Sequence, residues 1–312
     1  MQDYSPHISV MDPVGPAIEH VKAVLFRPFD LERWLAIGFS AWLAQLGSGR
    51  GSNGGAEAKK HYQFDSLRDA YHQGHEYVVT NAGWLLPAVF IGSALVVGIW
   101  IMLTWLSSRG RFMFLYNVTY NNAEVRRPWA MFREYAHSLF LFRLVLALVG
   151  LVAVGALVAA GAFGTIALWQ TSGPGALWTL FVLVPALIVV GLGLAMVSLF
   201  TTDFVLPVML LQSTYCVPAW RQFRDLLSDN KGRFFLYLLF RLLIDLVVGV
   251  IVLLLVLLTC CCAACFLALP YIGTVVLLPI HVFKRTYALH YLRQYGSDYD
   301  LLGPVPPQTN WI

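Results

Sequence analysis

A carboxylate inside a long apolar segment is the most chemically suggestive residue of this 312-residue sequence. Asp245 follows Arg241 by four residues, so the two side chains would share one face of a helix and could form an ion pair. A charged group at the centre of a membrane-spanning helix costs about 2.5–3.5 kcal/mol on insertion scales and is usually turned toward protein or water. Arg143 interrupts another apolar segment and could compete for the same carboxylate. We interpret the three as an intramembrane polar site in which an ion pair is the first expectation and a proton-relay or substrate role is the alternative.

Two other groups contain metal-ligand residue types, but we expect neither to bind a metal. Four cysteines crowd into one apolar stretch: Cys260, Cys261, Cys262 and Cys265. Consecutive residues of a helix point in different directions, and no His or carboxylate lies close by in sequence. A polar segment at 61–76 spaces carboxylates and a histidine as in a helix: Asp65, Asp69, His72 and Glu76. That pattern is typical of the solvated face of an amphipathic helix.

No catalytic residue and no cofactor is predicted either. The sequence contains no Walker loop, no dinucleotide fingerprint and no HExxH motif of a zinc protease. It also lacks the GxSxG motif of lipases. Nothing in the sequence therefore argues for an enzyme.

The composition points to a membrane protein. Hydrophobic residues make up 58% of the chain and charged residues only 12%, against about 25% charged residues in a typical soluble domain. The formal net charge of +4 is small, and the Lys and Arg residues are scattered between apolar blocks. This distribution does not support nucleic-acid binding, which requires a basic stripe or patch.

The lengths of the apolar stretches predict an all-α fold, a polytopic transmembrane helical bundle. A spanning helix needs about 20 mostly apolar residues, and clear candidates lie at 84–106, 139–169 and 177–200. The stretch 234–283 is long enough for two helices that meet in a turn near 259–264. The segment 34–46 is shorter and fits an interfacial or re-entrant helix as well as a short span. Counting it, we expect about six spanning helices.

Residues 1–312 are expected to form a single integral membrane domain. Its first part, 1–30, is predicted to lie on the membrane surface, with an amphipathic helix at 16–26. A polar loop at 47–81 and a C-terminal tail at 286–312 complete the domain.

The distribution of basic residues predicts the orientation. The connections 107–138 and 201–233 are rich in arginine, whereas the turns 170–176 and 259–264 carry no charge. Because Lys and Arg beside spanning helices prefer the cytoplasmic side, both basic connections and the C-terminus are expected there. We therefore expect a multi-pass protein of the bacterial inner membrane.

The basic connections also combine arginine with aromatic residues. Such segments are typical of helices that face anionic lipid headgroups. The residues that we expect to form this interface are Arg109, Arg111, Trp129, Arg133, Trp220, Arg221 and Arg224.

Several stretches resemble a group of uncharacterised bacterial multi-pass proteins similar to the membrane domain of glycerophosphoryl diester phosphodiesterase. They are RPFDLERWLAIGF at 27–39, TTDFVLPVMLLQ at 201–212, AWRQFRDLL at 219–227, GRFFLYLLFRLL at 232–243 and LPYIGTVVLLPIHVFKR at 269–285. The resemblance implies a bundle of inner-membrane helices to which no activity is assigned. Catalysis in that phosphodiesterase belongs to a separate soluble domain, for which this sequence has no counterpart, so no residue is carried over as catalytic.

Two functions from different classes follow. The first is a non-enzymatic membrane protein that binds lipids, or organises membrane or cytoplasmic partner proteins, through its basic and aromatic segments. The alternative is a transporter or channel in which Asp245 and Arg241 line the path. The transporter alternative is supported by an internal sequence similarity. The pattern WAMFRE at 129–134 resembles WRQFRD at 220–225, and each precedes an apolar helix.

Overall fold

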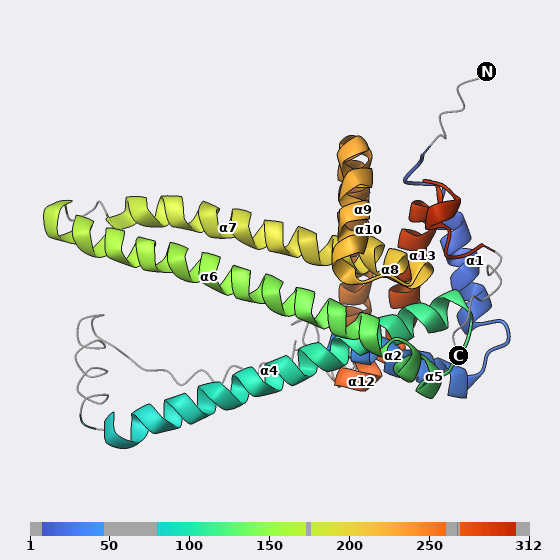
Figure 1. The fold of residues 1–312 in the computed structure, drawn as a ribbon, viewed down its shortest axis with the longest axis horizontal. Coiled ribbons are helices and arrows are strands. Elements are labelled where there is room, and N and C mark those ends of the chain that lie inside the picture. Colours follow the sequence, from blue (N-terminus) through green and yellow to red (C-terminus); the bar gives the residue numbers. More distant parts are fainter. Residues whose placement is uncertain are drawn as a thin grey trace.

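The computed structural model describes residues 8–46, 82–172, 176–259 and 269–303, together with the isolated residues 80 and 267. All regular secondary structure in these ranges is helical, which confirms the all-α prediction. The helices form a compact base, from which three long helices extend to one side (Figure 1). We call these extensions the arms.

The arms are the outer parts of α4 (Ala82–Thr119), α6 (Arg133–Ser172) and α7 (Ala176–Phe200). In Figure 1, α6 and α7 lie side by side as an antiparallel pair, and α4 diverges from them away from the base. Gly150 of α6 faces Leu194 of α7 closely, because a Cβ atom added there would lie 2.8 Å from Leu194 Cδ1 and would require that side chain to shift. Small residues at such contacts are typical of helices that pack within membranes.

Each of these helices is exposed in its arm and buried in the base. Phe90 of α4, Phe163 of α6 and Phe181 of α7 expose 76%, 77% and 72% of their surface. Toward the base, Phe112 and Leu139 are buried, and so is Phe200 at the end of α7. Soluble monomers rarely expose apolar patches of this extent. The exposed apolar surface of the arms is therefore suited to the hydrocarbon of a lipid bilayer.

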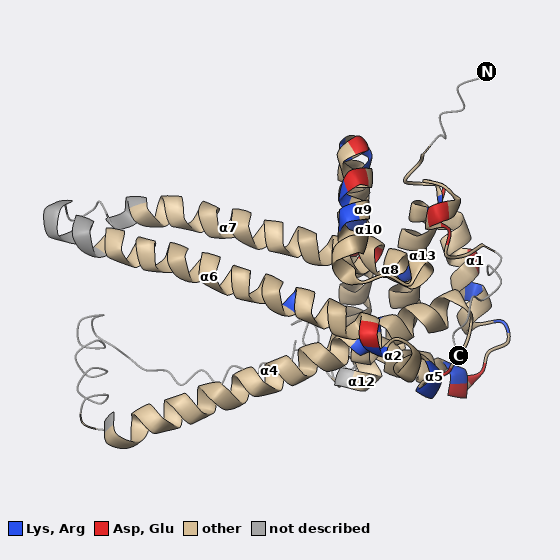
Figure 2. Cartoon of the chain, in the orientation of Figure 1, with Lys and Arg blue, Asp and Glu red and all other residues tan. Residues whose placement is uncertain are grey.

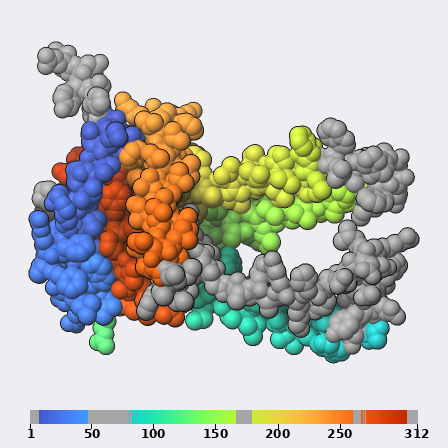
Figure 3. Space-filling model, turned by 180° about the vertical axis from the view of Figure 1, so that it is seen from behind, coloured from blue at the N-terminus to red at the C-terminus, as the bar shows by residue number. Residues whose placement is uncertain are grey.

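Four helices are long and apolar enough to cross a membrane within the described ranges: Gly83–Thr119, Arg133–Thr165, Thr179–Gln212 and Lys231–Leu258. By length and composition they are candidate membrane spans, while the six predicted spans remain a prediction. The fourth helix, α10 (Lys231–Leu258), runs across the direction of the arms (Figure 3). Its outer side is also apolar, since Leu246 is 63% exposed.

The segment predicted at 34–46 forms α2 (Leu31–Gln45). Its 15 residues extend about 22 Å, which is less than the roughly 30 Å of a hydrocarbon core. The helix packs against the inner part of α4, where a Cβ atom at Gly110 would lie 2.6 Å from the backbone nitrogen of Ala44. Glycine is therefore required at this contact.

The C-terminal helices differ from the expected fifth span. After 269 the chain forms the short α12 (Pro270–Val276) and then α13 (Leu278–Arg293), which is buried from Leu278 to Leu292 on its inner side. The predicted tail from 286 is therefore partly core. Most of the expected turn at 259–264 lies outside the described residues.

The helix predicted at 16–26 forms as α1 (Val14–Leu25), but its apolar face is covered by protein. Val21, Val24 and Leu25 pack against residues of α4 and α13. Hydrogen bonds join this segment to the C-terminal one: Gln294 donates to the carbonyl of Ser9, and the Tyr287 hydroxyl donates to that of Val10. The two ends of the described chain therefore meet in the base.

Short helices complete the base. They are α5 (Arg126–Met131), α8 (Leu206–Gln212), α9 (Cys216–Asp229) and the 3-10 turn η3 (Ser297–Tyr299). Aromatic rings fill the space between them, with Phe204 stacked on Phe223 at 5.2 Å and edge-on to Phe234 at 5.2 Å. This dense packing gives the base a fixed geometry.

Candidate functional site

One π-helical turn, η2 (Thr201–Val205), joins α7 to α8. Pro207 accounts for part of it, because proline has no amide hydrogen to donate to the carbonyl of Asp203 four residues earlier. Single π-helical turns are rare and often occur at functional sites. Thr201 and Asp203 are buried in this turn, which places polar groups in the middle of an apolar base.

Asp203 is the centre of a buried polar cluster. Its Oδ2 accepts a hydrogen bond from the Tyr237 hydroxyl at 3.0 Å and lies 3.7 Å from Arg241 Nε. Arg285 of α13 donates to the carbonyl of the neighbouring Thr202. A buried ion pair gains stability when further hydrogen bonds satisfy its members; Tyr237 does this for Asp203, whereas Arg241 Nε and Nη1 donate no hydrogen bond in the described structure. Here the cluster connects the π-helical turn to α10 and α13.

A second ion pair joins α10 to α13. Lys284 Nζ lies 2.5 Å from Asp245 Oδ1, and both side chains are partly exposed. The expected pair of Arg241 with Asp245 is therefore replaced by two pairs between helices. The prediction failed because residues distant in sequence supply a closer partner for each of the two groups.

The guanidinium of Arg143 bonds to neutral groups of α4. Its Nη1 donates to the hydroxyls of Ser107 and Ser108, at 3.2 and 3.1 Å, and to the carbonyl of Thr104 at 3.4 Å. Arg143 therefore does not compete for Asp245 in the described structure. It lies where α6 leaves the base, and it is the last charged residue before Asp203 in the sequence.

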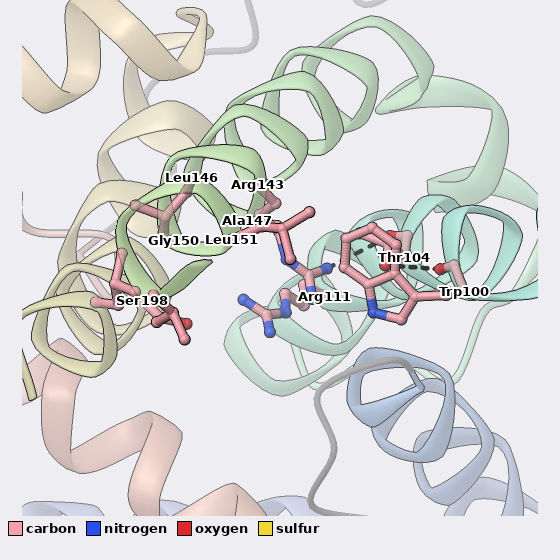
Figure 4. Close-up of a pocket in the computed structure, with 11 residues that line it drawn as sticks. Trp100, Thr104, Arg111, Arg143, Leu146, Ala147, Gly150, Leu151 and Ser198 are labelled. Atoms are coloured by element: carbon pink, nitrogen blue, oxygen red, sulfur yellow. Dashed lines mark hydrogen bonds between the residues drawn. The ribbon is translucent and has the colours of Figure 1, made fainter. Parts of the chain in front are cut away.

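Arg111 is buried, although we expected it at the membrane interface. Its Nη1 donates to Thr202 Oγ1 at 2.7 Å, so the side chain points from α4 toward the π-helical turn. The expected surface helix around it is the inner part of α4. Figure 4 shows the guanidinium groups of Arg111 and Arg143 in the same space between the helices.

That space is a pocket of about 550 Å³ between α4, α6 and α7. Small-molecule sites typically have about 300–1,000 Å³. Polar residues line its base end, including Arg111, Arg143 and Ser198. Residues of α6, with Trp100 of α4 and Leu194 of α7, form the apolar remainder. The pocket lies where the helices change from buried to exposed.

Arg109 is held between two aromatic rings. Its guanidinium carbon lies 4.4 Å from the centre of the Trp105 ring and 4.9 Å from that of Trp129. Such cation–π contacts contribute about 0.5–1 kcal/mol at exposed sites. Arg133, predicted for the same interface, is exposed at the start of α6.

The other predicted interface lies on α9. Arg221 and Arg224 are exposed on it, while Phe223 is buried in the base. Trp220 is half-buried and donates from Nε1 to Thr201 Oγ1 at 3.2 Å. The helix therefore presents its arginines outward from a fixed apolar side.

Two titratable groups of α13 are shifted by burial. Burial lowers the pKa of Arg285, with nearby Asp203 acting in the opposite direction. Burial also lowers the pKa of His281, whose Nδ1 lies 2.8 Å from the carbonyl of Leu277. A neutral imidazole that donates from Nδ1 fits this geometry.

Sequence reasoning missed Asp203, Tyr237, Lys284 and Arg285 as members of the site. One local signal was available, because Asp203 stands four residues before a proline in an apolar run. Such a carboxylate cannot face lipid without cost, so it must have partners. The partners themselves come from α10 and α13, and no local pattern identifies them.

In the part of the chain that the structure describes, no group of His, Cys, Asp and Glu is arranged to hold a metal ion. The cysteine cluster at 260–265 and the polar segment at 61–76 lie outside those residues. Cys216 is described, and it is a buried free thiol whose pKa burial raises to about 12.

A family of unknown function, DUF7544, matches residues 8–278. No curated protein matches the chain, and no solved structure matches it.

Proposed function

The chain belongs to the DUF7544 family, and we propose that it is a multi-pass inner-membrane protein, not an enzyme, that binds anionic lipid through the cytoplasmic surface of its base. The observation that carries the proposal is where the charged residues lie in Figure 2. The arms carry no charge beyond Arg143, whereas the other described charged residues, of both signs and with basic ones in slight excess, lie on the base.

The arms supply the membrane part of this proposal. Between residues 82 and 108, and again between 144 and 202, the sequence has no charged residue. The apolar side chains exposed there are suited to acyl chains. With the arms in the bilayer, the arginines at the start of α6 and on α9 lie at the same end of the arms. The positive-inside rule assigns that end to the cytoplasm.

The base supplies the lipid-binding part. Arg221 and Arg224 on α9, and Arg133 on α6, are exposed beside half-buried tryptophans. Each Lys or Arg near an anionic membrane surface contributes about 1 kcal/mol. Arg224 Nε lies 3.8 Å from Asp225 Oδ1, but both side chains are about 70% exposed. These arginines can therefore also contact an acidic cytoplasmic protein, which is the second class of partner in the proposal.

We also propose, from the sequence resemblance, that the chain is related to the membrane domain of glycerophosphoryl diester phosphodiesterase, which would be consistent with a membrane protein without catalytic activity.

The transporter alternative has less support. Asp245 and Arg241 are held by Lys284 and Asp203, and neither lines the pocket between the arms.

Lipid selectivity tests the proposal. The purified protein is reconstituted with spin-labelled phosphatidylglycerol or phosphatidylcholine of the same chain length, and the immobilised lipid fraction is measured at low and high salt. We expect preference for the anionic lipid at low salt, and a smaller preference at high salt because salt screens exposed charges. Equal association of the two lipids at both salt concentrations would contradict the proposal.

A pair of double variants separates charge from structure. Replacing Arg221 and Arg224 by Gln should reduce the preference about fivefold or more, whereas replacing both by Lys should leave most of it. Lipid selectivity that the Gln variant leaves unchanged would exclude α9 as the binding surface.

A further inference from the structure

The pocket between the arms has two unlike ends. Its base end contains the guanidinium groups of Arg111 and Arg143 with the hydroxyl of Ser198 (Figure 4). Away from the base, its wall is mostly formed by apolar residues of α6 as far as Val154, with Trp100 and Leu194 beside them. From Arg143 to Val154 the helix rises about 16 Å, so the apolar wall runs outward along the arm.

The base end favours an anion. The lining residues include two arginines and no carboxylate. Arg143 donates only to neutral oxygens among its described hydrogen bonds. Charge-assisted hydrogen bonds from arginine to phosphate or carboxylate are shorter and stronger than such neutral contacts. A negatively charged group would therefore form a stronger hydrogen bond with Arg143 than its present neutral partners do.

The surrounding base strengthens this preference. The charged residues that the described structure buries are Arg111, Asp203, Arg241 and Arg285. The buried side chains therefore include three guanidinium groups and one carboxylate, and this balance favours an anion over a cation in the adjacent pocket.

The apolar wall decides between a free anion and an amphiphile. Leu151 on this wall is 70% exposed, and the wall continues into the part of α6 that we assign to the bilayer. Water or an ion would gain nothing from such a surface, whereas an acyl chain would. We propose that the pocket binds one anionic lipid, with its headgroup at Arg111 and Arg143 and an acyl chain along α6. The inference rests on the proposed function in one respect, namely that the arms lie in the bilayer.

Native mass spectrometry tests the site. The full chain is released from nanodiscs that contain equal amounts of phosphatidylglycerol and phosphatidylcholine with identical acyl chains. We expect one phosphatidylglycerol to remain bound per protein. The variant Arg143→Gln should reduce this occupancy about tenfold or more, as expected for the loss of a charge-assisted hydrogen bond. Arg143→Lys should retain most of it. No retained lipid, retention of both lipids alike, or full occupancy in Arg143→Gln would overturn the site.

Two controls keep the test decisive. Ala147→Phe narrows the apolar part without changing the charge, so it should also displace the lipid, while Arg224→Gln on the outer surface of α9 should not. In a second experiment, inorganic phosphate is added as a competitor to the protein in the nanodiscs before its release. If it displaces phosphatidylglycerol at comparable concentration, the pocket is a site for free anions and the lipid proposal fails.

The failure of this inference can be told apart from failure of the proposed function. Surface selectivity is measured with spin-labelled lipids and should respond to Arg221 and Arg224. The single retained lipid should respond to Arg143. If selectivity is normal and no lipid is retained, the pocket is refuted while the surface function stands.

Discussion

Replacing Asp203 by Asn removes the single carboxylate that the described structure buries, with almost no change in side-chain size. Arg241 Nε, at 3.7 Å, loses its charged partner, and the Tyr237 hydroxyl loses its charged acceptor at 3.0 Å. Removing one partner of a buried ion pair costs about 3–5 kcal/mol, because the remaining charge stays buried. We expect Asp203→Asn to lower the free energy of unfolding by about that amount.

Two other variants calibrate the result. Tyr237→Phe removes only the hydrogen bond to the carboxylate and should cost about 1.5–3 kcal/mol. Asp245→Asn breaks the pair of Asp245 with Lys284, whose side chains are 31% and 25% exposed, so the expected cost is smaller, about 1 kcal/mol. Unfolding in mixed micelles, followed by circular dichroism during titration with a denaturing detergent, measures all three. If Asp203→Asn were no more destabilising than Asp245→Asn, the buried cluster would not be what holds the π-helical turn to α10.

Three further predictions concern the base. A Cβ atom at Gly110 would lie 2.6 Å from the backbone of Leu43 and Ala44, so Gly110→Ala should destabilise the protein by about 1–3 kcal/mol; Gly98→Ala, with open space around it, is the control in the same unfolding assay. Burial lowers the pKa of His290 from 6.5 to about 4, so the unfolded chain binds this proton more tightly. As the pH falls from 6.5 to 4, the free energy of unfolding should decrease by up to about 1 kcal/mol per pH unit. The variant His290→Leu should flatten that profile. Cys216 is buried with a pKa of about 12, so in a variant without the other cysteines a maleimide should modify it at neutral pH only after unfolding, as mass spectrometry would show.

Hydropathy predicted the long helices well, because twenty consecutive apolar residues suit a helix in lipid. It could not show where lipid exposure ends. In α4 the polar and basic residues at 107–111 interrupt the apolar run, yet the helix continues through them from the exposed Phe90 to the buried Phe112. The predicted helix therefore stops at 106, whereas the observed one continues to Thr119 as part of the base. A protein core and a bilayer select the same residue types.

The surface residues show a similar limit. Arg109 and Arg111 are two positions apart, which places them about 200° apart around a helix. One lies between Trp105 and Trp129, and the other donates to Thr202 in the interior. Residue type alone grouped them together, and only the packing of α4 in the base separates them.

Partners distant in sequence set the third limit. The four-residue spacing of Arg241 and Asp245 permits a local ion pair. The structure instead pairs Arg241 with Asp203 and Asp245 with Lys284, each nearly forty residues away along the chain. Such pairs depend on how α10 and α13 pack, and no periodicity in the sequence contains that information.

The central claim is that the exposed apolar arms lie in a lipid bilayer, and extraction of native membranes tests it most directly. Membranes from cells that express the full chain are washed with alkaline carbonate and centrifuged, and the protein is then quantified in both fractions. The account predicts that the protein remains in the pellet and dissolves only with detergent. Release into the carbonate supernatant as a folded, monodisperse species would contradict it.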